Sequence, residues 1–97
     1  MKYELKIRDI QIIPLRPRDG LIAFASFILE DAFFVGNVAI HTRPDGFIRL
    51  VYPDKLLPNG KRISCFHPID RDAGRHIEMC VGNRLKEITE SVLDADK

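Results

Sequence analysis

The chain has few cysteines, no tryptophan and almost balanced charge. Its two cysteines, Cys65 and Cys80, are too few for a disulfide framework, so we expect free thiols and a cytoplasmic location. The formal net charge of +1 argues against a uniformly basic nucleic-acid-binding protein. The longest mainly apolar stretch, Leu21–Leu29, has nine residues, too few for a membrane-spanning helix, and no signal-peptide segment follows the charged N-terminus. We therefore expect no membrane partner.

Motifs typical of catalysis are also missing. The sequence has no glycine-rich phosphate loop and no Gly-x-Ser-x-Gly nucleophile motif. Cys65 and His67 would point to the same side of a strand, but no acid that could orient such a pair is evident. Asp70 and Asp72 have the positions of helix-capping residues. We expect no enzymatic activity and no small-molecule substrate.

Apolar patterns predict about five strands within residues 3–67. The expected strands are residues 3–12 with a phase slip near Arg8–Asp9, then Leu21–Glu30, Ala32–Ile40, 47–52 and 61–66. The proline- and glycine-containing sequences at 44–46 and 58–60 predict tight turns. No helix separates the strands, so we expect an antiparallel meander with Leu21–Glu30 as a central strand covered on both sides, at least in part.

After Asp70 the apolar residues recur every three or four positions, which predicts an amphipathic helix over about 71–92. Asp70 is the expected N-cap, and Gly74 and Gly82 are expected to mark a close approach of the helix to the sheet. The predicted fold is therefore α+β in one domain, residues 1–97: an antiparallel sheet of about five strands followed by one long C-terminal helix. One helix covers only part of one sheet face, while the strands carry apolar side chains on both faces. We therefore expect a homodimer.

Basic side chains concentrate in the middle of the chain. Residues 41–71 hold six basic against three acidic side chains, a net charge of +3. Such cations, spread over two turns and a helix N-terminus, could contact the phosphates of a nucleic acid. The candidates from this pattern are Arg49, Lys55, Lys61, Arg62, Arg71 and Arg75, with Arg84 and Lys86 as an extension along the helix. The alternative is a solvated charged surface, in which Arg84 and Lys86 pair with acids of the helix.

Two further features allow more than one interpretation. Tyr52 and Phe66 adjoin the basic turns and are the best candidates for stacking single-stranded bases, although most aromatic residues are expected in the core. Cys65 and His67 on a strand could join His76 and Cys80 on the helix in a zinc site. That spacing is not a standard zinc-finger pattern, so we expect no metal and no other cofactor.

The motifs of the chain resemble those of the stage V sporulation protein G family (SpoVG, septation regulators). The likeness is carried by LIAFASFILEDAFFVGNVAI and by FIRLVYPDKLLPNGKRISCFHPIDRDAGRHI, which contain the turns Pro53-Asp54-Lys55 and Pro58-Asn59-Gly60 and the signature His67-Pro68-Ile69. It implies a small dimer with an antiparallel sheet and a C-terminal helix, binding of DNA and RNA with little sequence preference in gene regulation, and no enzymatic activity.

The resemblance also bears on single residues. Lys55 matches the lysine of the family turn, and Arg75 and His76 lie where the family is commonly polar or basic. Ile63 stands where the family usually has an arginine, with Arg62 beside it. The sequence thus predicts a cytoplasmic, homodimeric regulator that binds nucleic acid through Arg49, Lys55, Lys61, Arg62, Arg71, Arg75, His76 and Arg84. The alternative is a dimeric protein-interaction adaptor on the same fold, without nucleic-acid binding.

Overall fold

The computed structural model describes residues 4–95 of the chain, with side chains as far as residue 90. Residue 3, where the first strand was expected to begin, lies outside the described residues. Four antiparallel strands form the main sheet in the order β1-β2-β3-β4, and one helix follows at the C-terminal end. The strands are β1 (Ile7–Arg18), β2 (Leu21–Leu29), β3 (Phe33–Thr42) and β4 (Ile48–Val51), and the helix is α1 (Arg71–Ala95).

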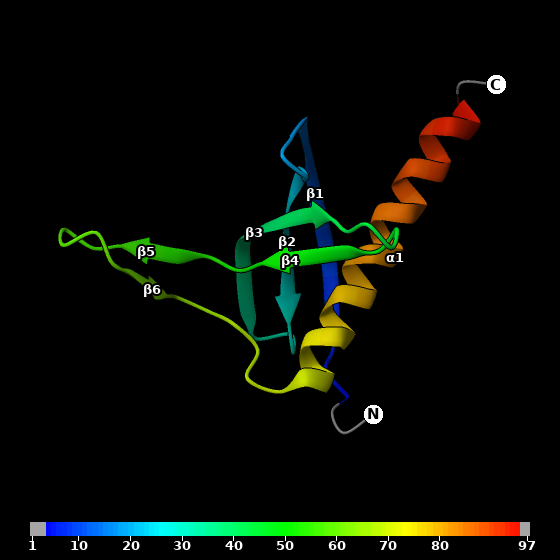
Figure 1. Ribbon diagram of the computed structural model, residues 1–97. Coiled ribbons are helices and arrows are strands. Elements are labelled where there is room, and N and C mark those ends of the chain that lie inside the picture. Colours follow the sequence, from blue (N-terminus) through cyan, green and yellow to red (C-terminus); the bar gives the residue numbers. More distant parts are fainter. Residues whose placement is uncertain (1–3, 96–97) are drawn as a thin grey trace.

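The predicted meander and C-terminal helix are therefore confirmed. In Figure 1 the helix crosses one face of the sheet. Its N-terminus is capped as expected, because the Oδ2 atom of Asp70 accepts hydrogen bonds from the backbone N–H groups of Asp72 (3.0 Å) and Ala73 (3.1 Å). Within the described residues, no helix is long and apolar enough to cross a membrane.

The number of strands in the sheet differs from the expectation. The chain leaves the sheet after β4 and forms a separate two-stranded ribbon from β5 (Asp54–Leu56) and β6 (Arg62–Ser64), which we call the hairpin arm. Pro53 lies between β4 and β5 and has no backbone N–H to continue the pairing of the main sheet. Figure 1 shows the arm projecting away from the sheet and the helix. The radius of gyration is 14.5 Å, against about 12.5 Å for a compact domain of this length.

The phase slip predicted near Arg8–Asp9 is a β-bulge. The register with β2 shifts between Arg8 and Gln11, and Asp9 adopts a positive φ of 52°. The predicted hairpin between β2 and β3 is also present, with Glu30 and Asp31 both at positive φ in its turn. Asp31 accepts hydrogen bonds from the Lys6 Nζ atom (2.8 Å) and the Arg8 Nε atom (2.5 Å), which anchor this turn to β1. These two cations lower the pKa of the Asp31 carboxyl.

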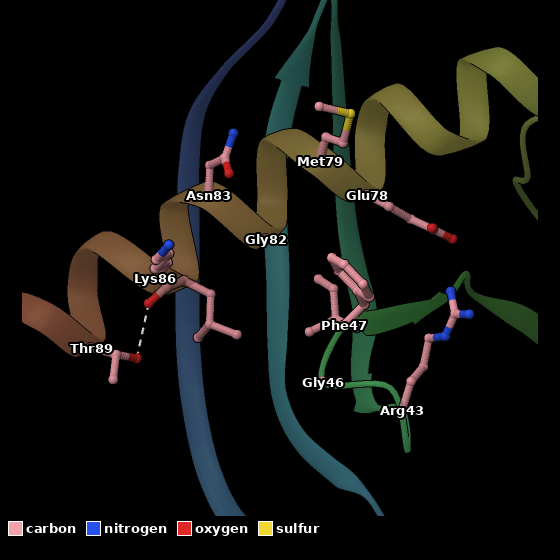
Figure 2. Close-up of a pocket in the computed structure, with 11 residues that line it drawn as sticks. Arg43, Gly46, Phe47, Glu78, Met79, Gly82, Asn83, Lys86 and Thr89 are labelled. Carbon is pink, nitrogen blue, oxygen red and sulfur yellow. Dashed lines mark hydrogen bonds between the residues drawn. The ribbon is translucent and has the colours of Figure 1, made fainter.

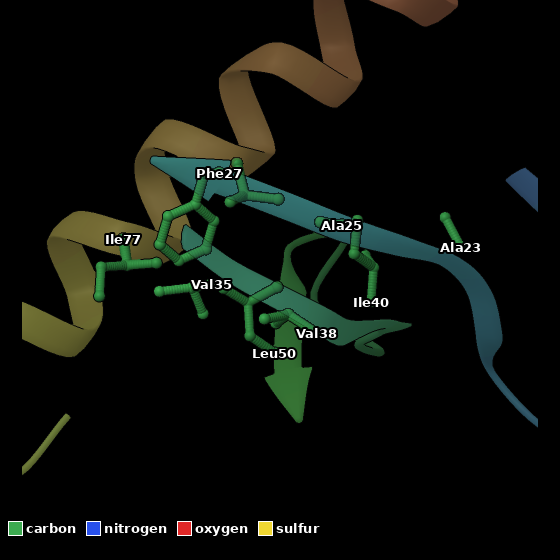
Figure 3. Packing of buried hydrophobic residues seen from close by; sticks show 9 residues of the cluster. Ala23, Ala25, Phe27, Val35, Val38, Ile40, Leu50 and Ile77 are labelled. Atoms are coloured by element: carbon green, nitrogen blue, oxygen red, sulfur yellow. The ribbon is translucent and has the colours of Figure 1, made fainter. Parts of the chain in front are cut away.

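The hydrophobic core lies between the sheet and α1. Buried residues alternate along β2, as expected for a strand, whereas on β3 a register shift separates Val35 from Val38. Figure 3 shows Phe27 and Val35 close to Ile77 of the helix. The buried set is Ala23, Ala25, Phe27, Val35, Val38, Ile40, Leu50, Ile77 and Val81. The helix comes close to β4 at Gly82, where an added Cβ atom would stand 3.7 Å from the Ile48 side chain. The expected close approach at this glycine is thus confirmed.

The opposite face of the sheet, which we call the open face, carries no helix of residues 4–95. The strand registers align Ile13, Phe24, Ala39 and Val51 in one row across all four strands. Ile13 is 65% exposed and Val51 39% exposed, while Phe24 and Ala39 are half-buried. The central strand is therefore covered on one face only within a single chain, and an apolar row remains accessible on the other.

Candidate nucleic-acid interface

The structure distributes the predicted nucleic-acid-binding residues over three regions. Lys55, Lys61 and Arg62 belong to the hairpin arm, and Arg49 lies on β4. Arg49 pairs in register with His41, two positions along from the Ala39–Val51 pair. Because residues two apart on a strand share a face, Arg49 lies at the rim of the open face. Arg71, Arg75 and Arg84 follow along α1. The sequence cluster at 41–71 therefore becomes an extended set of cations rather than one compact patch.

The hairpin arm is held in shape by its turn. The Leu57 N–H donates to the Lys61 carbonyl oxygen (2.8 Å), the Gly60 N–H to the Leu57 carbonyl oxygen (2.9 Å), and the Lys61 N–H to the Asn59 Oδ1 atom (3.0 Å). Gly60 has a positive φ of 85°, which suits a glycine at this turn. The arm thus presents Lys55 and Lys61 on a defined, exposed ribbon.

The cations differ in whether an acid already neutralises them. Arg62 donates to the Asp54 Oδ1 atom at 2.7 Å, and Arg84 to the Glu87 Oε2 atom at 3.1 Å. The Arg84–Glu87 pair corresponds to the alternative weighed for Arg84, a surface pair within the helix. Over residues 4–90, no carboxylate lies within ion-pair distance of the other five predicted arginines and lysines, which are all exposed: Arg49, Lys55, Lys61, Arg71 and Arg75.

His76 lies apart from the other predicted residues and has a structural partner. Its Nε2 atom donates to the Leu5 carbonyl oxygen at 2.8 Å, since a carbonyl oxygen can only accept. The Sγ atom of Cys80 lies 3.7 Å from the same nitrogen, and burial raises the pKa of the Cys80 thiol. The half-buried ring therefore ties α1 to the segment before β1, and its position does not favour a phosphate contact.

The structure does not assemble the zinc site considered from the sequence. The Nδ1 atom of His67 shares a 2.6 Å hydrogen bond with the Ser64 hydroxyl, so His67 orders the segment between β6 and α1. Cys65 is exposed and Cys80 is half-buried on the helix. Among the described residues, no three or more histidine, cysteine or acidic side chains gather as metal ligands.

The structure does not favour the base-stacking role considered for Tyr52 and Phe66. Their ring centroids lie 5.6 Å apart, and both rings pack against the core. Burial, aided by the charge of Glu78, raises the pKa of the Tyr52 hydroxyl above its ordinary value. Tyr52 follows Val51 directly, so its side chain takes the opposite face of the strand, which here is the helix side. Among the phenylalanine and tyrosine side chains that the structure describes, the exposed ones are Phe33, Phe34 and Phe47, at 64%, 72% and 70%.

Sequence reasoning missed a groove between α1 and the turn before β4. The groove has a volume of about 630 Å³ and lies between Phe47 of the turn and Met79, Gly82 and Lys86 of the helix. Figure 2 shows the Phe47 ring rising from the turn towards the helix. The signal available in the sequence was weak: Phe47 follows Pro-Asp-Gly, and Met79 interrupts the polar side of the amphipathic helix.

Comparison with known proteins supports the resemblance carried by the motifs. No protein-family model matches the chain. A Staphylococcus aureus (strain MRSA252) protein named "Putative septation protein SpoVG" is 26% identical over 90 residues, which cover 93% of this chain and 89% of that protein. The chain is thus similar to a SpoVG protein over most of the length of both.

Proposed function

We propose that the chain is a SpoVG-like regulatory protein of the cytoplasm that binds nucleic acid as a homodimer. The observation that carries the binding proposal is the set of five exposed cations without a carboxylate partner in the described part of the chain: Arg49, Lys55, Lys61, Arg71 and Arg75. Phosphate groups bind cations that are accessible and not already neutralised. The similarity to a SpoVG protein supports a regulatory role.

The distribution of these cations defines the kind of binding that we propose. They spread over β4, the hairpin arm and the N-terminal half of α1 and alternate with acids, and the net charge of the chain is only +1. Binding should therefore be electrostatic, modest in affinity and sensitive to salt, with little direct reading of sequence. A dimer would carry two sets of these cations and could make twice as many phosphate contacts. Its affinity for nucleic acid would therefore exceed that of a single chain, although each contact stays the same.

The homodimer is proposed from the open face. Three strand spacings of about 4.8 Å give the apolar row a width of about 14 Å across the sheet. The row consists of Ile13, Phe24, Ala39 and Val51 and contains no charged side chain. A second copy that covers this row would remove exposed apolar surface from water on both chains. The same row favours the alternative function, an adaptor whose open face binds another protein.

The binding proposal is tested by fluorescence anisotropy with labelled single-stranded RNA and duplex DNA, at about 50 and 200 mM salt. The variant K55A/K61A/R75A should bind severalfold more weakly. Its salt slope for duplex DNA should fall by up to about 2.7, the value for three lost phosphate contacts. The matched control is Arg18→Ala, which removes an exposed cation at the end of β1, a strand that belongs to neither the arm nor the helix. No binding by the unchanged protein at 50 mM salt would refute the proposal and favour the adaptor.

A further inference from the structure

The groove between α1 and the turn before β4 combines an exposed aromatic ring with cations. On the helix side, Met79, Asn83 and Lys86 line the groove. Arg75 lies outside this lining, four residues before Met79, and shares one face of α1 with the three, because the steps are four, four and three residues. The rise of 1.5 Å per residue separates Arg75 from Lys86 by about 16 Å along the axis. This face therefore has a cation at each end and an apolar and an amide side chain between them.

Across the groove, the turn holds Phe47 in a fixed position. The Phe47 N–H donates to the Asp45 Oδ1 atom (3.0 Å), and the Phe47 carbonyl oxygen accepts from the Arg43 N–H (2.9 Å). Arg43 in turn forms an ion pair with Asp45 at 2.7 Å. Both backbone groups of Phe47 are thus bonded within the turn, while its ring stays 70% exposed. A ring held in this way needs little further ordering to bind a ligand.

The chemistry of the groove selects a flat, partly polar ligand attached to anions. Phe47 and Met79, the latter 65% exposed, offer an aromatic face and a polarizable thioether. Figure 2 shows Asn83 and Lys86 on the helix beside them, with Arg43 and Glu78 at the other end of the groove. Within the described residues, no acid forms an ion pair with Lys86 or Arg75. Aromatic stacking between flanking cations is the arrangement by which proteins bind single-stranded nucleic acid.

We infer that this groove binds an unpaired nucleobase, stacked on Phe47, with the neighbouring phosphates at Arg75 and Lys86. The inference rests on the proposed nucleic-acid binding and adds a ligand class to it. A paired base keeps both its faces inside the duplex stack and cannot reach Phe47, whereas a base of a single strand can. The protein should therefore bind single-stranded nucleic acid more tightly than duplex of the same sequence.

The test uses a labelled single strand of about 12 nucleotides, within the site sizes of single-strand-binding proteins, and its duplex. Phe47→Ala should weaken single-strand binding about 5- to 150-fold, as expected for the loss of one stacked base. Its salt slope should stay unchanged, because no phosphate contact is lost. Phe47→Tyr, which keeps the aromatic face, should retain binding. Phe33→Ala is the matched control, since Phe33 is also an exposed phenylalanine, at 64%.

The possible results distinguish a failure of the base-stacking groove from a failure of the proposed nucleic-acid binding. If the unchanged protein binds single strands and Phe47→Ala binds them equally well, the base-stacking groove is refuted while nucleic-acid binding stands. If the unchanged protein binds neither ligand, the proposed function itself is refuted. If Phe47→Ala instead turns a dimer into a monomer in sedimentation, the groove is an interface between copies, which also overturns the inference. Thermal unfolding of each variant, compared with the unchanged protein, shows that the variants are folded.

Discussion

Replacing Gly82 with alanine should stabilise the protein by about 1 kcal/mol. Glycine in a helix interior costs about that much relative to alanine, because it loses more backbone freedom on folding. Gly82 lies inside α1, and a methyl group there would stand 3.7 and 3.8 Å from the Cδ1 and Cγ1 atoms of Ile48. Both distances are ordinary van der Waals contacts, so neither the helix nor β4 has to move to accept it. The gain in helix propensity should therefore be retained in full.

A domain of this size converts 1 kcal/mol into a rise in Tm of about 4–8 °C. Thermal unfolding followed by circular dichroism measures this rise, at one protein concentration because dimerisation would make Tm concentration-dependent. The control is Gly60→Ala, which places a side chain at a φ of +85° with no neighbouring atom in the way and should destabilise by about 1 kcal/mol or more. An unchanged or lower Tm for Gly82→Ala would refute the spacing between helix and sheet described above.

Three further predictions test the open face, the buried hydroxyl and the β2–β3 turn. Ile13→Glu should leave the single chain folded, since Ile13 is 65% exposed there. In a symmetric dimer across the open face, the substitution is present in both chains, and each chain loses the burial of one isoleucine side chain. This loss alone should weaken dimer association about 30- to 1000-fold, as measured by sedimentation equilibrium. A native chain that sediments as a monomer would contradict this interface. Tyr52→Phe should keep or raise the free energy of unfolding in urea, by up to about 1 kcal/mol, because the Tyr52 hydroxyl is buried without a hydrogen-bond partner in the described structure. A large loss of stability would reveal a partner for that hydroxyl. Asp31, whose folded pKa is lowered by Lys6 and Arg8, contributes stability that is present above the ordinary carboxyl pKa and is lost as pH falls through the folded pKa. Asp31→Asn should therefore be less stable than the unchanged protein at pH 7, and the difference should shrink below about pH 4; a difference independent of pH would refute the role of the charge.

Elements of the fold could be predicted from the sequence where a local pattern is compatible with only one kind of structure. The change from alternation to three- and four-residue spacing after Asp70 can only place apolar side chains on one face of a helix. The bulge at Asp9 was visible because alternation reversed its phase there. The hairpin arm was not visible, because a short β-like segment such as Arg62–Ser64 shows that a strand exists but not which strand it pairs with. Pro53 marks the end of β4 without giving the direction that the chain takes afterwards.

The candidate site was harder to predict, because it depends on which residues meet in space. Sequence proximity correctly joined Lys55, Lys61 and Arg62, since a tight turn keeps them on one arm. It could not separate the partnered Arg62 from the unpartnered Lys61, because the partner Asp54 is a cross-strand neighbour. Adjacent strand residues such as Val51 and Tyr52 take opposite faces, and nothing local indicates which face the helix covers. The groove at Phe47 needed the crossing of α1 over the turn, which is a property of the tertiary fold.

Nucleic-acid binding through unneutralised cations is the central claim, and the salt dependence of binding by the unchanged protein tests it most directly. The affinity for a labelled single strand should fall on a straight line against the logarithm of salt concentration between about 50 and 200 mM, with a slope of several units. That result would indicate several phosphate contacts, as predicted by the five exposed cations that have no ion pair within residues 4–90. Absence of binding at 50 mM salt, or binding with a slope near zero, would contradict the account.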